Sequence, residues 1–156
     1  MAKPKITTFL WYDTNAEEAA KHYTSIFENS KIGQVARYGE GGPGPKGSVM
    51  TVQFTLDGVE FTALNGGPQF KFTEAVSLVV HCETQKEVDH FWSKLSAGCE
   101  EGPCGWLKDR VGLSWQIVPN ALPRLLADPK KAERVMGAVM QMKKLDIARL
   151  EEAGRP

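Results

Sequence analysis

The chain lacks an excess of charge of either sign, a long apolar run and a cysteine framework. Its 156 residues hold nineteen Lys and Arg against nineteen Asp and Glu, so no whole-chain field recruits nucleic acid or an anionic membrane. No segment approaches the length of a membrane-spanning helix, and the apolar run in MAKPKITTFLWYD is too short for a signal peptide. The expected partner is therefore a small molecule or another subunit.

Cysteine is sparse as well. Cys82, Cys99 and Cys104 are an odd set without a C-x-x-C pair. This usage argues against a disulfide scaffold and favours reduced thiols in a cytoplasmic protein. The remaining composition, 42% hydrophobic and 24% charged, is typical of a globular protein. The length suits a single domain over 1–156 that buries most of its apolar surface without staples.

The first part of the chain, residues 4–66, predicts one module of strands around a helix. ITTFLWY reads as a strand, and Thr14-x-x-Glu17 has the pattern of a helix-capping box. After a flexible loop in GEGGPGPKG, the segment SVMTVQFTL alternates apolar and polar residues, as a half-buried strand does. Asp57-Gly58 predicts a hairpin turn into VEFTALN.

Residues 73–120 repeat this order. AVSLVVH predicts a strand, Thr84-x-x-Glu87 a second capping box with a helix behind it, and KDRVGLSWQIV a turn and strand similar to LDGVEFTALN. A single shift superposes Tyr23 on Phe91 and other apolar helix positions on one another. Two copies of strand, helix and three strands are the simplest organisation that fits.

The tail, residues 121–156, predicts helices. Asp128 is placed to cap a helix with Pro129 at its first position, and Asp146 to cap a final short one. An apolar stripe follows Asp128 at helical spacing. Its members are Ala132, Val135, Met136, Val139 and Met140. Such a stripe packs against the modules or against a second subunit.

Four segments carry a family resemblance: LWYDTNAEEAAKHYTSIF, LNGGPQFKFTEAVSLVVHCETQKEVDHFW, CGWLKDRVGLSWQIVP and MKKLDIARLEEA. They resemble the vicinal oxygen chelate superfamily, which includes glyoxalases, bleomycin-resistance proteins and extradiol dioxygenases. The closer similarity is to its PhnB-like branch, often labelled 3-demethylubiquinone-9 3-methyltransferase. The resemblance implies an α+β fold in which two βαβββ modules form facing half-barrels around a cavity, followed by C-terminal helices, and it implies a homodimer.

The resemblance also implies where a metal would bind. Metal-using relatives hold a divalent ion with His, Glu or Gln from the first and last strands of each module. The corresponding positions here are Thr8, Leu64 or Asn65, Ala75 to Ser77, and Gln116. Neutral amides and hydroxyls hold a divalent ion weakly, and Glu74 adds a single carboxylate. We expect no tightly bound catalytic metal and predict no cofactor. A weak divalent metal site stays open, although its ligands are poorly represented.

Seven side chains are candidates for lining the implied cavity and binding a ligand. They are Trp11, Tyr12, Gln53, Asn65, His81, Trp106 and Gln116. Trp11 and Tyr12 fall on opposite faces of one strand, and we favour Tyr12 as the one facing the cavity. Gln116 alternates with Trp115, which we expect in the core. Gln116 either faces the cavity or completes a local hydrogen-bond network.

The other candidates also have structural interpretations. Trp106 is either a stacking wall or an aromatic plug between sheets, and the plug is favoured. His81 ends a strand and is the one histidine we consider as a general base. The turn that begins at Asn65 either binds an anion or simply links the modules. A structural role is favoured for Cys104, and turn chemistry accounts for Asp109.

Four functions are compatible with these patterns. The favoured one is a small-molecule-binding protein with no metal. The alternatives are a metal-dependent lyase, isomerase or dioxygenase of the same superfamily, a methyltransferase as the family label says, and a structural or regulatory dimer. A methyl donor of the nucleotide type usually needs a Gly-rich turn between a strand and a helix, and the glycines at 39–47 and 66–67 lie between predicted strands instead. Whether the protein catalyses a reaction stays open.

Overall fold

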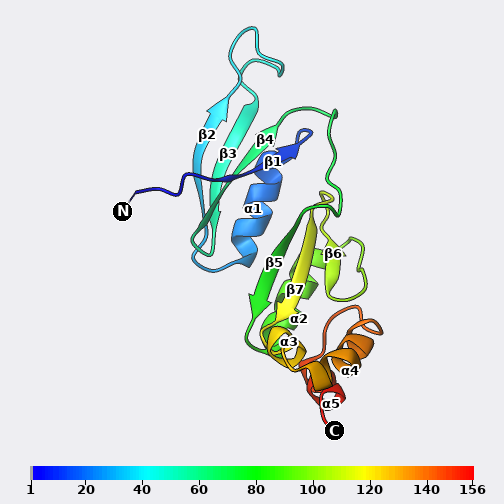
Figure 1. Ribbon diagram of the computed structural model, residues 1–156. Helices are drawn as coiled ribbons and strands as arrows, with labels where there is room; N and C mark the ends of the chain where they lie inside the picture. The colour runs from blue at the N-terminus through cyan, green and yellow to red at the C-terminus, as the bar shows by residue number, and fades with distance from the viewer. Residues whose placement is uncertain (1) are drawn as a thin grey trace. The chain divides into compact units, whose positions relative to one another are not determined.

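The chain divides after Lys71 into two units. The N-terminal unit contains the first sheet. The computed structural model describes residues 2–156. The sheet has the order β1-β4-β3-β2, with β1 parallel to β4 and the other neighbours antiparallel (Figure 1). Its strands are β1 (Thr8–Tyr12), β2 (Lys31–Arg37), β3 (Val49–Leu56) and β4 (Val59–Asn65).

Helix α1 (Ala16–Ile26) covers one face of this sheet. The predicted alternation of β3 is confirmed, since Val52 and Phe54 are buried and Gln53 between them is exposed. On the helix side, Ala19, Ala20 and Tyr23 are buried. Burying a large apolar side chain contributes roughly 1.5–3 kcal/mol, so this layer of contacts fixes which face of the sheet stays open.

Two local predictions for this unit have different outcomes. The Asp57-Gly58 turn is confirmed, with positive φ at both residues (46° and 80°) as a tight hairpin of this type requires. The capping box at Thr14 is wrong, because α1 begins one residue later and has no side-chain cap from its own N-cap residue, Asn15. Instead the Ala16 N–H donates to Asn65 Oδ1 at 2.8 Å, so a residue at the end of β4 satisfies the helix terminus.

The second unit contains a three-stranded sheet of order β5-β7-β6. It is formed by β5 (Ser77–Cys82), β6 (Trp106–Lys108) and β7 (Ser114–Pro119), with α2 (Gln85–Ser96) packed on one face. Strands β5 and β7 are parallel, and β6 and β7 are antiparallel. The α+β class and the modular order are confirmed, with one strand fewer than the predicted repeat.

A single bridge between Glu101 and Leu107 stands where a further strand was expected. Pro103 explains the interruption, since it has no N–H to donate to a ladder and fixes its own φ. The Gly102 N–H still donates to the Trp106 carbonyl at 2.8 Å. The segment before β6 is therefore held beside it without forming a regular strand.

Helix α2 begins with the predicted capping box. The Glu87 N–H donates to Thr84 Oγ1 at 3.2 Å, and the Glu87 carboxylate accepts the Glu83 N–H at 2.9 Å. The second contact reaches one residue further back than in the usual box, where the N-cap N–H is the donor. Both contacts satisfy N–H groups that the helix itself leaves free.

Asp109 organises the turn between β6 and β7. Its Oδ1 accepts the N–H groups of Val111 (2.9 Å) and Leu113 (3.1 Å), and its Oδ2 accepts the Trp115 indole N–H at 2.8 Å. The residue is 4% exposed. The predicted turn role is confirmed, and the carboxylate additionally anchors Trp115, whose predicted core position is also confirmed.

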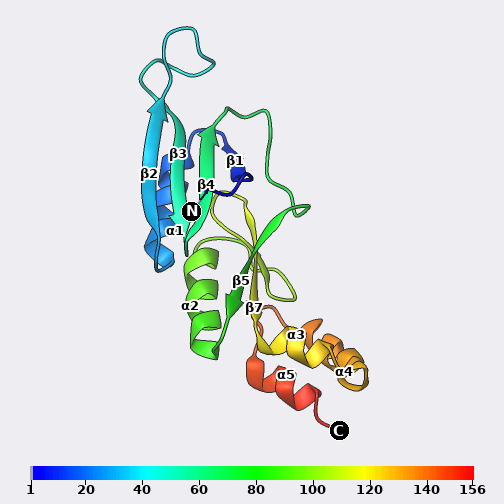
Figure 2. The same cartoon turned by 60° about the vertical axis from the view of Figure 1, so that its left-hand side comes forward.

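Three helices follow β7 and form a small cluster of their own (Figure 2). They are α3 (Ala121–Leu126), α4 (Pro129–Val139) and α5 (Ile147–Ala153). Side chains of Asp128 and Asp146 cap α4 and α5 as predicted. The predicted apolar stripe divides, because Val135 and Val139 enter the cluster core whereas Met136 and Met140 are 40% and 63% exposed. Across residues 2–156, every helix is too short or too polar to span a bilayer.

Replacing Asp109 tests whether its carboxylate holds the β6–β7 turn. We expect Asp109→Ala to lower the free energy of unfolding by about 3 kcal/mol, because it leaves three N–H groups without their acceptor, one of them the buried indole. Asp109→Asn keeps one oxygen and should cost less. Urea unfolding followed by tryptophan fluorescence measures both. A loss below about 1 kcal/mol for the alanine variant contradicts this role.

The buried thiol of Cys82 provides a second test. Burial, with a smaller contribution from the charge of Glu87, raises its pKa from 9.0 to about 12. A higher pKa disfavours the thiolate, so at pH 8 the native protein should hold about 1000-fold less reactive thiolate at this position. In a Cys99→Ser, Cys104→Ser variant, which leaves Cys82 as the sole cysteine, a thiol reagent should react only after denaturation. Rapid reaction in the native state would show that Cys82 is accessible.

Candidate functional site

The second sheet has a packed face and an open face, and the side chains of β7 alternate between them. Trp115 and Ile117 are buried in the core, where α2 contacts β7. Side chains alternate along a strand, so Ser114 and Gln116 lie on the opposite face. Strand β6 contributes to the same face, because Lys108 pairs with Ser114 and Trp106 pairs with Gln116 in register.

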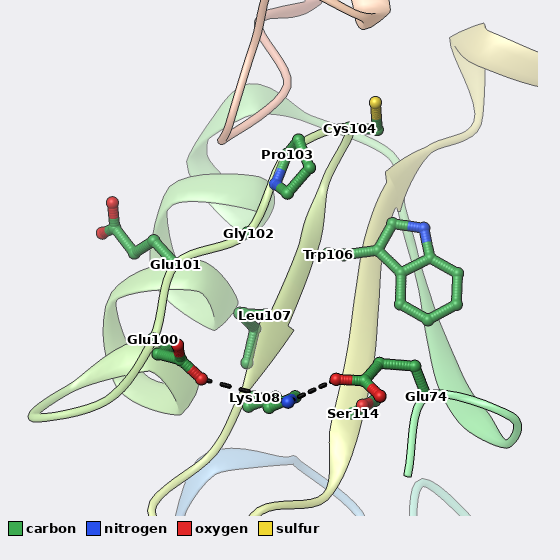
Figure 3. A pocket seen from close by; sticks show the side chains of 10 residues that line it. All are labelled: Glu74, Glu100, Glu101, Gly102, Pro103, Cys104, Trp106, Leu107, Lys108 and Ser114. Atoms are coloured by element: carbon green, nitrogen blue, oxygen red, sulfur yellow. Dashed lines mark ion pairs between the residues drawn. The ribbon is translucent and has the colours of Figure 1, made fainter.

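A pocket of about 600 Å³ lies on this open face, entirely within the second unit. Figure 3 shows it with the Trp106 indole on one side and the charged groups of Glu74 and Lys108 beside Ser114. The lining residues are Glu74, Glu100, Glu101, Gly102, Pro103, Cys104, Trp106, Leu107, Lys108 and Ser114. The volume lies in the range of small-molecule sites.

Lys108 holds the charged groups of the pocket together. Its ammonium forms an ion pair with Glu74 and lies 4.0 Å from Glu100 Oε2 (Figure 3). The hydrogen bond to Lys108 lowers the pKa of Glu74, and the same bond raises the pKa of Lys108. Both groups are partly exposed, so the pair contributes little to stability. Its effect is to keep both groups ionised at the rim of the pocket.

Ser114 is the unusual polar group of the pocket. The residue is 1% exposed, and its Oγ is the one buried side-chain oxygen or nitrogen that lacks a hydrogen-bond partner among residues 2–156. A buried hydroxyl without a partner costs about 1–3 kcal/mol. Its location among the lining residues places this unused donor and acceptor at the wall of the pocket.

The position of Trp106 is set by the two residues before it. Cys104 and Gly105 both have left-handed backbone, with φ of 61° and 83°. Their N–H groups donate to the carbonyls of Met142 and Lys143, each at 2.8 Å. A Cβ at Gly105 would lie 3.0 Å from the Ile117 carbonyl oxygen, so only glycine fits there. The thiol of Cys104 contacts Met140 Sδ at 3.7 Å.

The structure brings two of the seven predicted ligand-binding residues together. Trp106 and Gln116 are neighbours on paired strands, and Trp106 lines the pocket. The amide of Gln116 donates to Ser77 Oγ at 2.9 Å, which is the local network considered as its alternative role. His81 lies on β5 with an exposed side chain and pairs in register with Val118.

The other four predicted residues belong to the first unit. Tyr12 is 2% exposed and its hydroxyl lies 3.3 Å from that of Tyr23 on α1, so it faces the helix. Trp11 is the more accessible of the two. Gln53 is exposed on β3. Asn65 bonds the N–H of Ala16 at its oxygen and the carbonyl of Val49 at its nitrogen, which is a structural arrangement.

The segment after β4 covers Trp11. The indole N–H donates to the Gly67 carbonyl at 2.9 Å, and the ring meets Phe70 edge-on with centroids 4.9 Å apart. A Cβ at Gly66 would lie 2.4 Å from the indole, so glycine is required for this close approach. Within the first unit, the turn that begins at Asn65 thus serves to pack Trp11.

The side chains present do not fit a resident divalent ion. Within residues 2–156, no three His, Cys, Asp or Glu side chains converge as metal ligands. At the positions implied by the resemblance, the amide oxygen of Asn65 accepts the Ala16 N–H, and the amide nitrogen of Gln116 donates to Ser77 Oγ. Amide oxygens without carboxylate or imidazole support bind such an ion weakly.

Several pocket residues were missed by sequence reasoning. Lys108 lies two residues after Trp106 and therefore on the same face of a strand, so the period of two could have found it. Glu100, Glu101 and Pro103 come from the irregular segment before β6. Its acidic pair gave no signal because a strand was expected there, and periodicity does not place side chains of an irregular segment.

The similarity to known proteins covers the region of the two modules. A family model described as 3-demethylubiquinone-9 3-methyltransferase matches residues 4–118. A PhnB protein from Bacillus cereus is 41% identical, and the match covers 74% of this chain and 99% of that chain with a TM-score of 0.65. No curated protein matches the chain.

More distant solved structures share the fold alone. Protein PA1353 from Pseudomonas aeruginosa is 16% identical over 75% of this chain and 98% of its own, with a TM-score of 0.62. The fosfomycin resistance protein FosX from Mesorhizobium loti is 10% identical over 82% of this chain and 100% of its own, with a TM-score of 0.59.

Two successive modules, each a sheet with a helix on one face and an open face opposite, define a protein of the vicinal oxygen chelate class. The residues matched, and the identity to the PhnB protein, narrow this further. The chain belongs to the 3-demethylubiquinone-9 3-methyltransferase family, the PhnB-like branch of that superfamily. The family predicted from the sequence is thereby confirmed.

Two serine-to-alanine variants on the open face test the state of Ser114. We expect Ser114→Ala to leave the free energy of unfolding unchanged or to raise it by up to about 1 kcal/mol, since the hydroxyl is desolvated without a bond in return. Ser77→Ala, the matched control, should lower it by about 1 kcal/mol because Gln116 loses its acceptor. Urea unfolding of both measures the difference. If Ser114→Ala lowers the free energy of unfolding more than Ser77→Ala does, the Ser114 hydroxyl already has a hydrogen-bond partner.

Proposed function

We propose that the protein binds a small molecule in the pocket on the open face of the second sheet. The observation that carries this proposal is the buried, unpartnered hydroxyl of Ser114 beside the Trp106 indole. The Trp106 indole supplies apolar contact area, and the Ser114 hydroxyl can orient a ligand through a hydrogen bond. Small-molecule sites generally combine these two features.

The indole of Trp106 suits a flat ligand. It lines the pocket together with Ser114, Glu74 and Lys108, and Figure 3 shows the Glu74 side chain below the indole, next to Lys108 and Ser114. A planar group stacked on the indole would place its polar substituents toward those three residues. Trp11, Tyr12, Gln53, Asn65, His81 and Gln116 stay predictions as further ligand contacts.

The proposal does not extend to the methyl transfer that the family description names. A strand-to-helix turn rich in glycine is the usual binding element for a nucleotide-like donor. The glycines at 39–47 connect β2 to β3, and those at 66–67 follow β4 and precede β5. The homodimer and the cytoplasmic location expected from the resemblance are part of the proposal, with exposed Met136 and Met140 as a surface available to a second copy.

Titration with indole, followed by ¹H–¹⁵N NMR, tests the pocket directly. We expect a dissociation constant of about 1 mM, as suits a ligand of this size. The largest shifts should occur at the Trp106 indole N–H and at the backbone of Ser114 and Lys108. Trp106→Ala should weaken binding at least about 10-fold through loss of the stacking surface.

Val59→Ala is the control, since this exposed residue lies in the other unit and should leave binding unchanged. Trp11→Ala in the same titration reports whether the first unit contributes to the ligand site. Shifts spread evenly over the chain, or equal binding by Trp106→Ala, would exclude this pocket as the site.

A further inference from the structure

Carboxylates outnumber cations in the pocket lining. Glu74, Glu100 and Glu101 contribute acidic groups against the single ammonium of Lys108. Glu74 and Glu100 share Lys108, which leaves this group of three with an excess negative charge. The Glu101 carboxylate bonds the Trp92 indole N–H at 3.0 Å and points away from Lys108 in Figure 3. It nevertheless adds to the negative field at the same rim.

An anionic ligand would be poorly accommodated by these groups. Its natural partner, Lys108, is already paired with Glu74, and displacing Glu74 would leave that carboxylate unpaired next to Glu100. A cationic ligand displaces nothing. It gains from the excess charge of the carboxylates, and Glu74 stays ionised because Lys108 lowers its pKa.

The remaining groups of the pocket suit a protonated amine as well. An ammonium near the face of an indole gains a cation–π interaction of about 0.5–2 kcal/mol, and Trp106 offers that face. The Ser114 hydroxyl can accept an N–H through a lone pair that no group of the described chain uses.

Resting on the proposed function, we propose that the pocket selects a cationic ligand, an amine or guanidinium that carries a flat apolar group. The flat group stacks on Trp106, and the cation lies between Glu74 and the Ser114 hydroxyl. The unpartnered Ser114 is the observation that distinguishes this site from an ordinary acidic patch on a surface.

Three probes with the same ring and different charge test this selection. They are tryptamine, 3-methylindole and indole-3-acetate, which are cationic, neutral and anionic near neutral pH. Isothermal titration of each into the native protein should show tryptamine binding at least about 10-fold tighter than indole-3-acetate and about 3-fold tighter than 3-methylindole. The advantage should shrink at high salt, because these charges are partly exposed.

Variants assign the preference to named groups. Glu74→Gln should reduce the advantage of tryptamine over 3-methylindole about 3-fold. Ser114→Ala should weaken the binding of tryptamine without lowering the free energy of unfolding. Glu133→Gln removes one carboxylate of α4 that does not line the pocket, and it should change neither ligand.

The outcomes distinguish charge selection from the proposed binding of a small molecule in this pocket. Binding of all three probes with equal affinity, or a preference for indole-3-acetate, overturns charge selection and leaves the pocket as a small-molecule site. Failure of all three probes to bind overturns both. A tryptamine preference that survives Glu74→Gln undiminished also counts against the inference, because the carboxylate would then play no part.

Discussion

The carboxylate of Asp109 fixes the geometry on which the second sheet depends. By accepting two backbone N–H groups and the Trp115 indole N–H, it sets the turn between β6 and β7 and orients the largest fully buried side chain of that unit. Since side chains alternate strictly along a strand, fixing Trp115 toward α2 fixes Ser114 and Gln116 toward the open face. The open face on which the pocket lies therefore follows from the turn that this one side chain holds in place.

Much of the fold could be predicted because its signals are local. The capping residues Thr84, Asp128 and Asp146, the Asp57-Gly58 turn and the alternation of β3 each act within a few residues, and the structure confirms them. The start of α1 could not be predicted in this way. Its N–H group is satisfied by Asn65, which lies 49 positions away in the sequence, and no local pattern at Thr14 reports such a partner.

The candidate site was predictable to a smaller extent. The open face of β7 followed from periodicity once Trp115 was assigned to the core. Trp106 was named as a candidate ligand contact, although an aromatic plug between sheets was its favoured interpretation. The charged part of the pocket was not, because Glu74 and Glu100 reach Lys108 from segments without regular structure. The repeat also predicted a strand where Pro103 permits only one bridge, and Glu100 and Glu101 of the pocket lie in that interruption.

The hydrogen bonds from Cys104 and Gly105 to Met142 and Lys143 have a thermodynamic consequence. They tie the backbone that presents Trp106 to the segment between α4 and α5, so the two regions order together. By linkage, a ligand that contacted Trp106 in this position would also protect the terminal helices against opening. The terminal helices thus support the backbone that presents Trp106, although none of their side chains lines the pocket.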